Sequence, residues 1–186
     1  MRVIAGKFRS RPLRSLRGLA LRPTSDRLRE TLFNVLAAAI PVEATVWLDL
    51  FAGTGAVGIE AISRGARQVL FVEESTAAAC LLQENLAQLQ ISDGFELIKF
   101  PVNVALRKLD AGGIHCDICF LDPPYRLRQA YEDSLQILSQ SQLLLPHSLV
   151  IVEHSRHFDP GEQNGRLLRY RKLKQGDAVL SFYKLA

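Results

Sequence analysis

The residues Asp122-Pro123-Pro124-Tyr125 form the motif whose groups have the clearest chemical use in this sequence. The carboxylate of Asp122 and the main-chain carbonyl of Pro123 can accept the two hydrogens of an exocyclic amino group on a nucleic-acid base. That nitrogen is a poor nucleophile, because its lone pair is delocalised into the ring, and two fixed acceptors would pull it toward a tetrahedral geometry. The prolines stiffen the loop, and Tyr125 offers a flat face for stacking. We predict catalytic roles for Asp122, Pro123 and Tyr125, although Asp-Pro-Pro alone also commonly begins a turn.

A glycine-rich loop supplies a second motif, in which Gly53, Gly55 and Gly58 match G-x-G-x-x-G after an apolar run. Glu73 follows Gly53 by twenty residues, where an acid can accept hydrogen bonds from ribose hydroxyls. Asp49 stands just before the glycines. A carboxylate there repels the pyrophosphate of a dinucleotide but attracts the ammonium and sulfonium of S-adenosylmethionine (AdoMet). The loop therefore favours an AdoMet site and disfavours an NAD-dependent oxidoreductase.

The surrounding sequence predicts the elements that must position these motifs. Short apolar strands are expected at 46–50, 68–73, 95–100, 116–121 and 149–153, and helices near 56–64, 76–90 and 128–140. This alternation is typical of a parallel sheet with helices on both faces, and residues 167–173 and 178–183 are expected to close it as a strand pair. We predict an α/β, doubly wound, mostly parallel Rossmann-like sheet. Strands 46–50 and 116–121 would be neighbours at its switch point, which would place Asp122 beside the glycine loop.

The N-terminal segment is strongly basic. Residues 1–29 contain Lys7 and eight arginines against one acid, a net charge of +8, so the remaining residues carry −4 of the total of +4. Clustered arginines suit contacts with phosphates, and the interleaved apolar residues argue against a merely solvated tail. We expect a hairpin over 1–15, turning near Gly6-Lys7, and a helix over 24–39. Residues 1–40 would form a basic extension to a methyltransferase domain at 41–186, with RNA-binding residues Arg9, Arg11, Arg14, Arg22 and Arg27.

Composition excludes several other classes of protein. No apolar run is long enough to span a membrane and the N-terminus lacks a signal peptide, so we expect a cytoplasmic protein, which we also expect to be monomeric. Cys116 and Cys119 form C-x-x-C, but on a strand positions three apart should point to opposite faces, and we expect no metal site. His154 and His157 are expected in a loop after the fifth strand.

These motifs together resemble the RsmD-like family of methyltransferases, which modify the N2 amino group of a guanine in 16S ribosomal RNA. The matching stretches are residues 2–7, 21–34, 49–65 and 122–125. The resemblance implies a ribosomal RNA or small-subunit partner, as free RNA or as an assembly intermediate. It also implies AdoMet contacts at Asp49, Phe51, Gly53, Gly55 and Glu73, and amino-group contacts at Asp122 and Tyr125.

The sequence departs from the family pattern at two places. Ser75 stands where the family often has an aspartate, two places after Glu73. Methyltransferases also often place an aspartate after the third strand to bind the adenine amino group, and Asn103 is the nearest candidate here.

Other functions share parts of this pattern. A DNA amino-methyltransferase and a protein glutamine methyltransferase use a similar clamp, but the first usually needs an added recognition domain and the second does not need a basic arm. An RNA-binding module with a relic cofactor fold would not need an intact Asp122. A second basic run, at residues 166–174, is either more RNA surface or a solvated strand edge guarded by charge.

Overall fold

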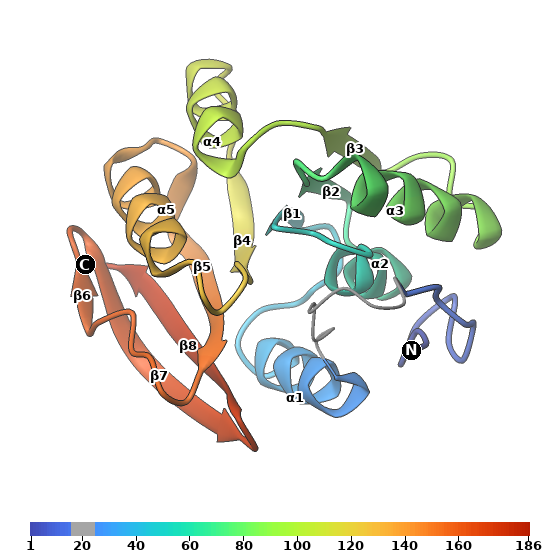
Figure 1. The fold of residues 1–186 in the computed structure, drawn as a ribbon, viewed down its shortest axis with the longest axis horizontal. Coiled ribbons are helices and arrows are strands. Elements are labelled where there is room, and N and C mark those ends of the chain that lie inside the picture. Colours follow the sequence, from blue (N-terminus) through green and yellow to red (C-terminus); the bar gives the residue numbers. More distant parts are fainter. Residues whose placement is uncertain (16–24) are drawn as a thin grey trace.

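The computed structural model describes residues 1–15 and 25–186. Their strands form one eight-stranded sheet with the order β3-β2-β1-β4-β5-β8-β7-β6 (Figure 1). The strands from β3 to β5 pair in parallel, and the last three pair antiparallel. The strands are β1 (Val46–Leu50), β2 (Gln68–Val72), β3 (Phe95–Ile98), β4 (Cys116–Leu121), β5 (Leu144–Ser155), β6 (Gln163–Asn164), β7 (Leu167–Gln175) and β8 (Ala178–Leu185). The prediction of a doubly wound, mostly parallel sheet is confirmed.

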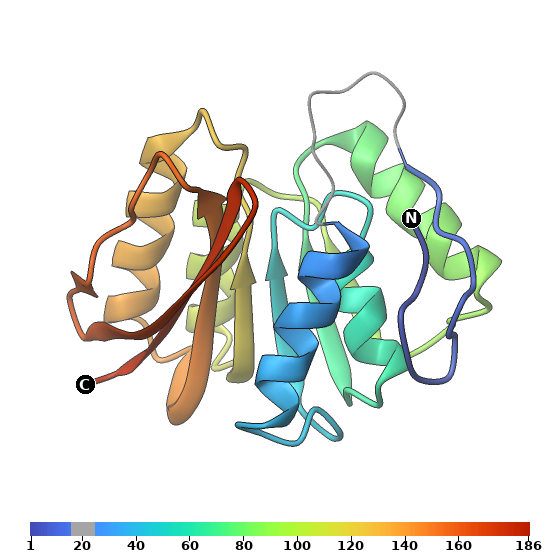
Figure 2. The ribbon, with the colours of Figure 1, turned by 90° about the horizontal axis from the view of Figure 1, so that it is seen from below.

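Helices cover both faces of this sheet (Figures 1 and 2). The described helices are α1 (Asp26–Ala37), α2 (Ala56–Ser63), α3 (Thr76–Gln88), α4 (Val102–Ala111) and α5 (Arg128–Gln140). Apolar residues of α1, α2 and α3 share one core cluster with Trp47, Phe71 and Phe120 of the sheet. Those of α4 and α5 share the other cluster with Leu48 and Leu121. Within the described residues, no helix is long and apolar enough to cross a membrane.

Strand β1 lies at the switch point of the sheet, as predicted. It pairs with β2 through Leu50 and Val72, and with β4 through Leu50 and Leu121. The main-chain N–H of Asp122 donates to the carbonyl of Leu50 at 3.4 Å. Figure 2 shows that β1 and β4 end at the same edge of the sheet, and that α1 begins at this edge. The loops after both strands therefore lie together, which the proximity of the two motifs requires.

The structure adds one helix to the predicted elements and corrects two strand boundaries. Helix α4 was not predicted, although Val102, Ala105, Leu106 and Leu109 are spaced as one buried face. The third strand ends at Ile98 rather than at residue 100, because Pro101 begins the turn into α4. Strand β5 extends through Ser155, so His154 is a buried strand residue and not part of a loop.

The prediction that the two thiols point to opposite faces is wrong. Cys116 and Cys119 are both buried in the core cluster beneath α4 and α5. The pairing of β4 with β5 shifts register between Cys116 and Ile118, so the simple alternation along the strand is broken there. In the part of the chain that the structure describes, no three metal-binding side chains come together.

The predicted N-terminal hairpin packs on the main domain. Arg2 and Pro12 form an isolated antiparallel β-bridge, and Val3 and Leu13 are buried in the same core cluster as α1. The main-chain N–H groups of Ile4 and Ala5 donate to the buried carboxylate of Glu60, at 2.7 and 3.0 Å. The division of the chain at residue 40 stays a prediction, but the described residues on both sides of it share one core. The predicted RNA contact Arg22 lies outside the described residues.

Candidate active site

The glycine loop joins β1 to α2 and is shaped by backbone geometry and by packing. Gly53 and Gly55 have φ of +55° and +77°, a backbone conformation that residues with a side chain rarely adopt. Gly58 is needed for a different reason, because a Cβ built there would lie 2.2 Å from the ring of Phe71 on β2. A Cβ at Gly53 would meet only the carbonyl of Phe51, at 3.9 Å. The loop is therefore packed behind Gly58 and open in front of Gly53, where a ligand can approach the backbone.

Phe51, which directly follows β1, has a φ of +61°. A bulky residue rarely adopts this conformation, and such strain is common at ligand sites. The half-buried ring packs against the core cluster under α4 and α5. The strained residue thus lies between Asp49 and Gly53, within the predicted cofactor loop.

Asp49 is 2% exposed, and its carboxylate accepts the main-chain N–H of Gly58 at 2.9 Å. Burial raises the pKa of this carboxyl to about 7; the hydrogen bond from Gly58 lowers the pKa, and the nearby Glu73 carboxylate raises it. Asp49 therefore holds the start of α2 in place. Its charge is poised to change near neutral pH.

Glu73 follows β2 and braces the same loop from the other side. Its two carboxylate oxygens accept the main-chain N–H groups of Gly53 and Ser75, each at 2.8 Å. The Ser75 hydroxyl accepts the N–H of Ala78 at 3.4 Å, which makes Ser75 the N-cap of α3. The serine that departs from the family pattern has a structural use here. Each carboxylate oxygen has further lone pairs that can accept a ribose hydroxyl.

The Asp122–Tyr125 loop is held by residues that lie outside the motif. The hydroxyl of Tyr131, on α5, donates to the carbonyl of Pro123 at 3.0 Å. The hydroxyl of Tyr125 donates to Glu153, on β5, at 3.3 Å. Tyr131 is fully buried and Glu153 is 3% exposed. Sequence reasoning missed both residues, because neither belongs to the Asp-Pro-Pro-Tyr motif and only the tertiary structure brings their side chains to it.

The pKa of the Tyr131 hydroxyl is shifted by its surroundings in this loop. Burial raises the pKa of its hydroxyl strongly, and Asp122, Tyr125 and Glu153 raise it further. The hydroxyl therefore stays protonated and remains a donor. One lone pair of the Pro123 carbonyl is used by Tyr131, and the other is left to accept a hydrogen from a substrate.

The predicted cofactor residue Asn103 lies apart from these contacts. It is exposed on the first turn of α4, and its amide oxygen accepts the N–H of Val104 at 2.8 Å. Helix α4 follows β3, and β2 separates β3 from β1 in the sheet. No described contact links Asn103 to the glycine loop, and its adenine-binding role stays a prediction.

The described arginines of the predicted RNA surface are all exposed. Arg11 donates to the carbonyl of Gln88 on α3 at 3.1 Å, and Arg14 pairs with Glu84 at 2.7 Å. Arg27 lies in the first turn of α1, at the edge where β1 and β4 end (Figure 2). Arg14 and Arg27 thus lie near this edge, Arg14 through Asn85, which also donates to Thr54 of the glycine loop. The turn of the hairpin that carries Arg9 instead packs on Ser63, at the other end of α2.

The second basic run is partly neutralised. Arg169 and Lys172 both contact Asp159, and Arg166 donates to the carbonyls of Ser139 and Ser141. These contacts favour a structural role for three of its five cations. The other two, Arg171 and Lys174, are exposed and leave both earlier interpretations open.

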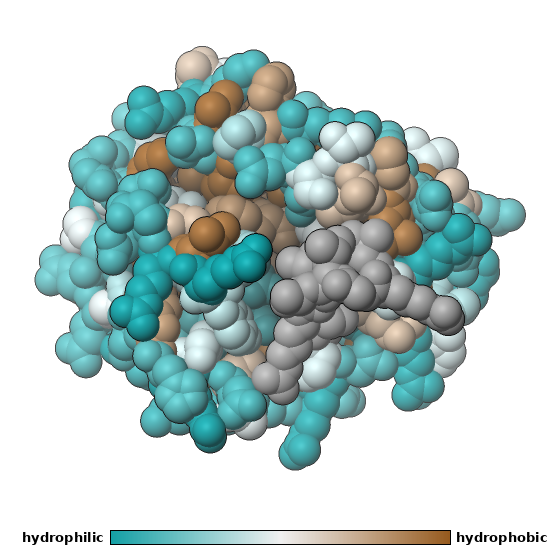
Figure 3. All heavy atoms as spheres, viewed as in Figure 1, coloured by the Kyte–Doolittle hydropathy of each residue, from teal (hydrophilic) through white to brown (hydrophobic). Residues whose placement is uncertain are grey.

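Figures 1 and 3 look onto the edge at which the parallel strands end. Hydrophobic residues gather in the middle of this face, over β4 and β5, and hydrophilic residues surround them (Figure 3). An apolar centre with a hydrophilic rim suits a flat base that is joined to a polar backbone. The surface therefore fits the base-stacking role predicted for Tyr125.

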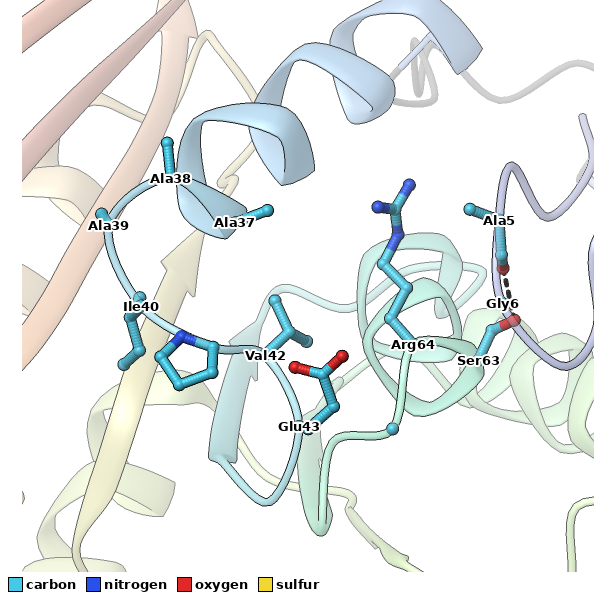
Figure 4. Close-up of a pocket in the computed structure, with 12 residues that line it drawn as sticks. Ala5, Gly6, Ala37, Ala38, Ala39, Ile40, Val42, Glu43, Ser63 and Arg64 are labelled. Carbon is cyan, nitrogen blue, oxygen red and sulfur yellow. Dashed lines mark hydrogen bonds between the residues drawn. The ribbon is translucent and has the colours of Figure 1, made fainter.

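A pocket at the opposite edge is not part of this site. It lies between the ends of α1 and α2 and the N-terminal hairpin, and its lining includes Ala5, Glu43, Ser63 and Arg64 (Figure 4). The Arg64 guanidinium is already paired with Glu60 at 2.8 Å. The pocket contains none of the predicted site residues.

Comparison with known proteins assigns the chain to a family. The family model described as Conserved hypothetical protein 95 matches residues 1–184. YlbH of Bacillus subtilis is 32% identical over 184 residues, which cover 99% of this chain and 98% of that protein. Ribosomal RNA small subunit methyltransferase D of Haemophilus influenzae is 38% identical over 153 residues, 82% of this chain and 78% of that protein.

Solved structures agree with the sequence comparison. A hypothetical protein of a Thermus species has a TM-score of 0.86 at 28% identity, over 100% of this chain and 99% of that one. The likeness therefore covers the N-terminal hairpin, the sheet and the closing strands together. The chain belongs to the Conserved hypothetical protein 95 family, the family of RsmD-like methyltransferases.

Proposed function

We propose that this protein transfers a methyl group from AdoMet to the exocyclic N2 amino group of a guanine in 16S ribosomal RNA. The observation that carries the proposal is the hydrogen bond from Asp122 to the end of β1, which places the Asp-Pro-Pro-Tyr loop beside the glycine loop. The name of the Haemophilus influenzae relative, a small-subunit ribosomal RNA methyltransferase, supports this substrate.

The residues around the glycine loop fit AdoMet, which supplies a methyl group on a cationic sulfonium when bound. The open side of Gly53 admits close approach of the ligand, with Gly55 and Phe51 completing the loop. Glu73 would accept the ribose hydroxyls while it holds the N–H of Gly53. Asp49 would add negative charge behind the loop, and Asn103 would accept from the adenine amino group.

The clamp would act on the target base by positioning. Asp122 and the free lone pair of the Pro123 carbonyl would each accept one hydrogen of the guanine amino group. That arrangement aims the nitrogen lone pair away from the acceptors and toward the methyl group, and preorganised acceptors of this kind cost no rearrangement at the moment of reaction. Tyr125 would stack on the base. Asp122 can then take the proton that the methylated nitrogen releases.

The RNA partner would be held by the basic arm. Arg9, Arg11, Arg14, Arg22 and Arg27 would contact phosphates and bring the guanine to the edge where β1 and β4 end. We propose that a monomer acts on free ribosomal RNA or on a partly assembled small subunit. Such a substrate places the enzyme in the cytoplasm, where ribosomes are assembled.

A transfer assay across substrate classes tests the proposal. Labelled methyl transfer from AdoMet should be measured to 16S ribosomal RNA, to duplex DNA and to a ribosomal protein fraction. We expect transfer to the RNA alone. Transfer to DNA or protein would instead support the amino-methyltransferase or glutamine-methyltransferase alternatives, and transfer to none of the three would favour an RNA-binding module.

A further inference from the structure

We infer that Glu153 is a positioning residue of the transfer reaction, which fixes the Tyr125 ring against the target base. The inference rests on the proposed function, because it assigns a task to a residue that touches the clamp rather than the substrate. Glu153 comes from β5, outside every motif that the sequence presents. Three observations carry the inference: its register, its burial and its contact.

The register places Glu153 next to Asp122. Strands β4 and β5 are parallel, and Leu121 pairs with Val152. The following residues, Asp122 just after β4 and Glu153 within β5, therefore lie at the same level on neighbouring strands, whose axes are about 4.8 Å apart. The acid of the clamp and the acid on β5 thus stand side by side at the edge that holds the site.

The burial of Glu153 is unusual for an acid. Its side chain belongs to a residue that is only 3% exposed, and a carboxylate so deeply buried is costly unless it is hydrogen-bonded. The hydroxyl of Tyr125 is one of its donors, at 3.3 Å. Because one donor to this buried acid is the aromatic residue of the clamp, the acid has a direct contact with the predicted substrate site.

The contact controls the direction of the ring. Tyr125 follows two prolines on a loop and is half-buried, so its ring is anchored at Cα by the stiff backbone and at the hydroxyl by Glu153. Two anchors at opposite ends fix the plane of the ring before the base arrives. The distance of 3.3 Å is long for a hydroxyl donor, and hydrogen bonds at catalytic sites often tighten only when substrate is bound.

The same hydrogen bond can be removed from either side. Tyr125→Phe keeps the ring and removes the donor, whereas Glu153→Leu removes the acceptor and fills the buried space with an apolar side chain. Glu153→Gln is the matched control, because its amide oxygen can still accept from Tyr125 while its charge is lost. The measurements are the single-turnover methyl-transfer rate at saturating AdoMet and RNA, the Kd for each ligand, and the thermal midpoint of each variant.

We expect Glu153→Leu and Tyr125→Phe each to lower the transfer rate roughly tenfold, the scale of one hydrogen bond. The double variant should be no slower than either single variant, because both remove the same interaction. Glu153→Gln should stay within roughly threefold of the wild type. The Kd for AdoMet and for RNA should change less than about twofold, since the glycine loop and the arm are untouched.

The inference is overturned if the losses of the two single variants multiply in the double variant, or if Glu153→Gln is as slow as Glu153→Leu. It is also overturned if Tyr125→Phe keeps the wild-type rate, a result that does not depend on whether the Glu153 variants fold. Failure of the proposed function would look different, because the wild-type protein itself would then transfer no methyl group to ribosomal RNA.

Discussion

Two acids at the ends of neighbouring strands differ in what surrounds them. Asp49, on β1, is buried behind the glycine loop and bonded to Gly58. Asp122, after β4, is half-buried at the surface of the site and lies beside Tyr125. The first can influence the cofactor only through its charge, and the second can touch a substrate. Their variants should therefore affect different steps.

Replacing Asp122 should mainly slow the chemical step. Its acceptor role strengthens as the amino nitrogen becomes tetrahedral, and binding that appears in the transition state raises turnover more than affinity. Asp122→Ala should lower the single-turnover rate by roughly 10²–10³-fold, the scale for losing one preorganised electrostatic partner, while AdoMet and RNA affinities stay close to wild type.

The asparagine variant separates two roles of Asp122. Its amide oxygen still accepts a hydrogen bond but cannot take a proton. Asp122→Asn should be faster than Asp122→Ala if acceptance is the main role, and as slow if proton removal is. Rapid-quench measurements distinguish these cases, and a wild-type rate for Asp122→Ala would show that the loop is only a turn.

The buried Asp49 should make AdoMet affinity depend on pH. Its pKa of about 7 means that the carboxyl is mostly neutral at pH 6 and mostly ionised at pH 8. A cationic ligand favours the ionised form, so affinity should rise by up to about tenfold per pH unit below pH 7 and then level off. Calorimetry between pH 5.5 and 7.5 measures this. Asp49→Asn should show no such rise, and an equal rise in both proteins would rule out Asp49 as its source.

The same shift has the opposite sign for the stability of the protein without ligand. The folded pKa of Asp49 is raised above its ordinary value of 3.8, so its protonated form favours the folded state. This contribution is fully present below about pH 4 and is lost as the pH rises through about 7. The thermal midpoint of the wild type should therefore fall relative to that of Asp49→Asn between pH 5 and 8.

At the scale of elements, helix α3 links the arm to the cofactor loop through one residue. The buried amide of Asn85 accepts the N–H of Arg14 at 2.8 Å and donates to the carbonyls of Arg14, at 3.2 Å, and Thr54, at 3.0 Å. Thr54 lies between the first two glycines of the loop. The position of the basic arm is thus coupled to the backbone that is predicted to hold AdoMet.

Asn85→Ala should loosen both elements together. It leaves three main-chain groups without their partner, which costs roughly 1–3 kcal/mol of folding free energy when such groups stay buried. Hydrogen exchange should become faster at the amide of Arg14, and AdoMet should bind more weakly. Gln88→Ala is the control, because Gln88 contacts the arm at Pro12 but has no described contact with the glycine loop. Equal effects of the two variants on AdoMet binding would refute the coupling.

The sequence predicts elements well where the signal is local. The apolar run of β1, the glycines after it and the cap of α1, where the Ser25 hydroxyl accepts the N–H of Leu28, all act within a few residues. Helix α4 was missed even though its buried spacing is regular. The register shift in β4 depends on its neighbour β5 and has no local signature.

The candidate site divides in the same way. Asp122 and the glycine loop could be predicted, because each is a short motif whose chemistry depends on adjacent residues. Tyr131 and Glu153 could not, because they reach the motif only through the packing of α5 and the pairing of β5 with β4. Supporting contacts of this kind depend on tertiary structure, and a single sequence does not reveal them.

At the scale of the whole molecule, positive charge is concentrated in the N-terminal segment. The start of α1 presents Arg27 at the edge where β1 and β4 end, and the hairpin carries its arginines along α3 from beside the glycine loop toward the opposite edge (Figure 2). Binding of RNA should therefore depend strongly on salt, and the dependence should come from the arm.

Replacing Arg9, Arg11 and Arg14 with alanine together should weaken RNA binding and flatten its salt dependence. Each lost contact with single-stranded RNA reduces the slope of log K against log salt by about 0.7, so the triple variant should lose about 2. AdoMet affinity should be unchanged. A Glu84→Gln variant provides the reverse test, because it frees Arg14 from its ion pair and should tighten binding. An unchanged slope in the triple variant would remove the arm from the RNA surface.

The identity of the methylated nucleoside tests the central claim most directly. The protein should be incubated with 16S ribosomal RNA, or with partly assembled small subunits, and AdoMet that carries a deuterated methyl group. The RNA should then be digested to nucleosides, and the labelled nucleosides should be identified by chromatography and mass spectrometry. The account predicts label in N2-methylguanosine alone, and its loss with Asp122→Ala. Label in another nucleoside, or N2-methylguanosine formed equally well by Asp122→Ala, would contradict it.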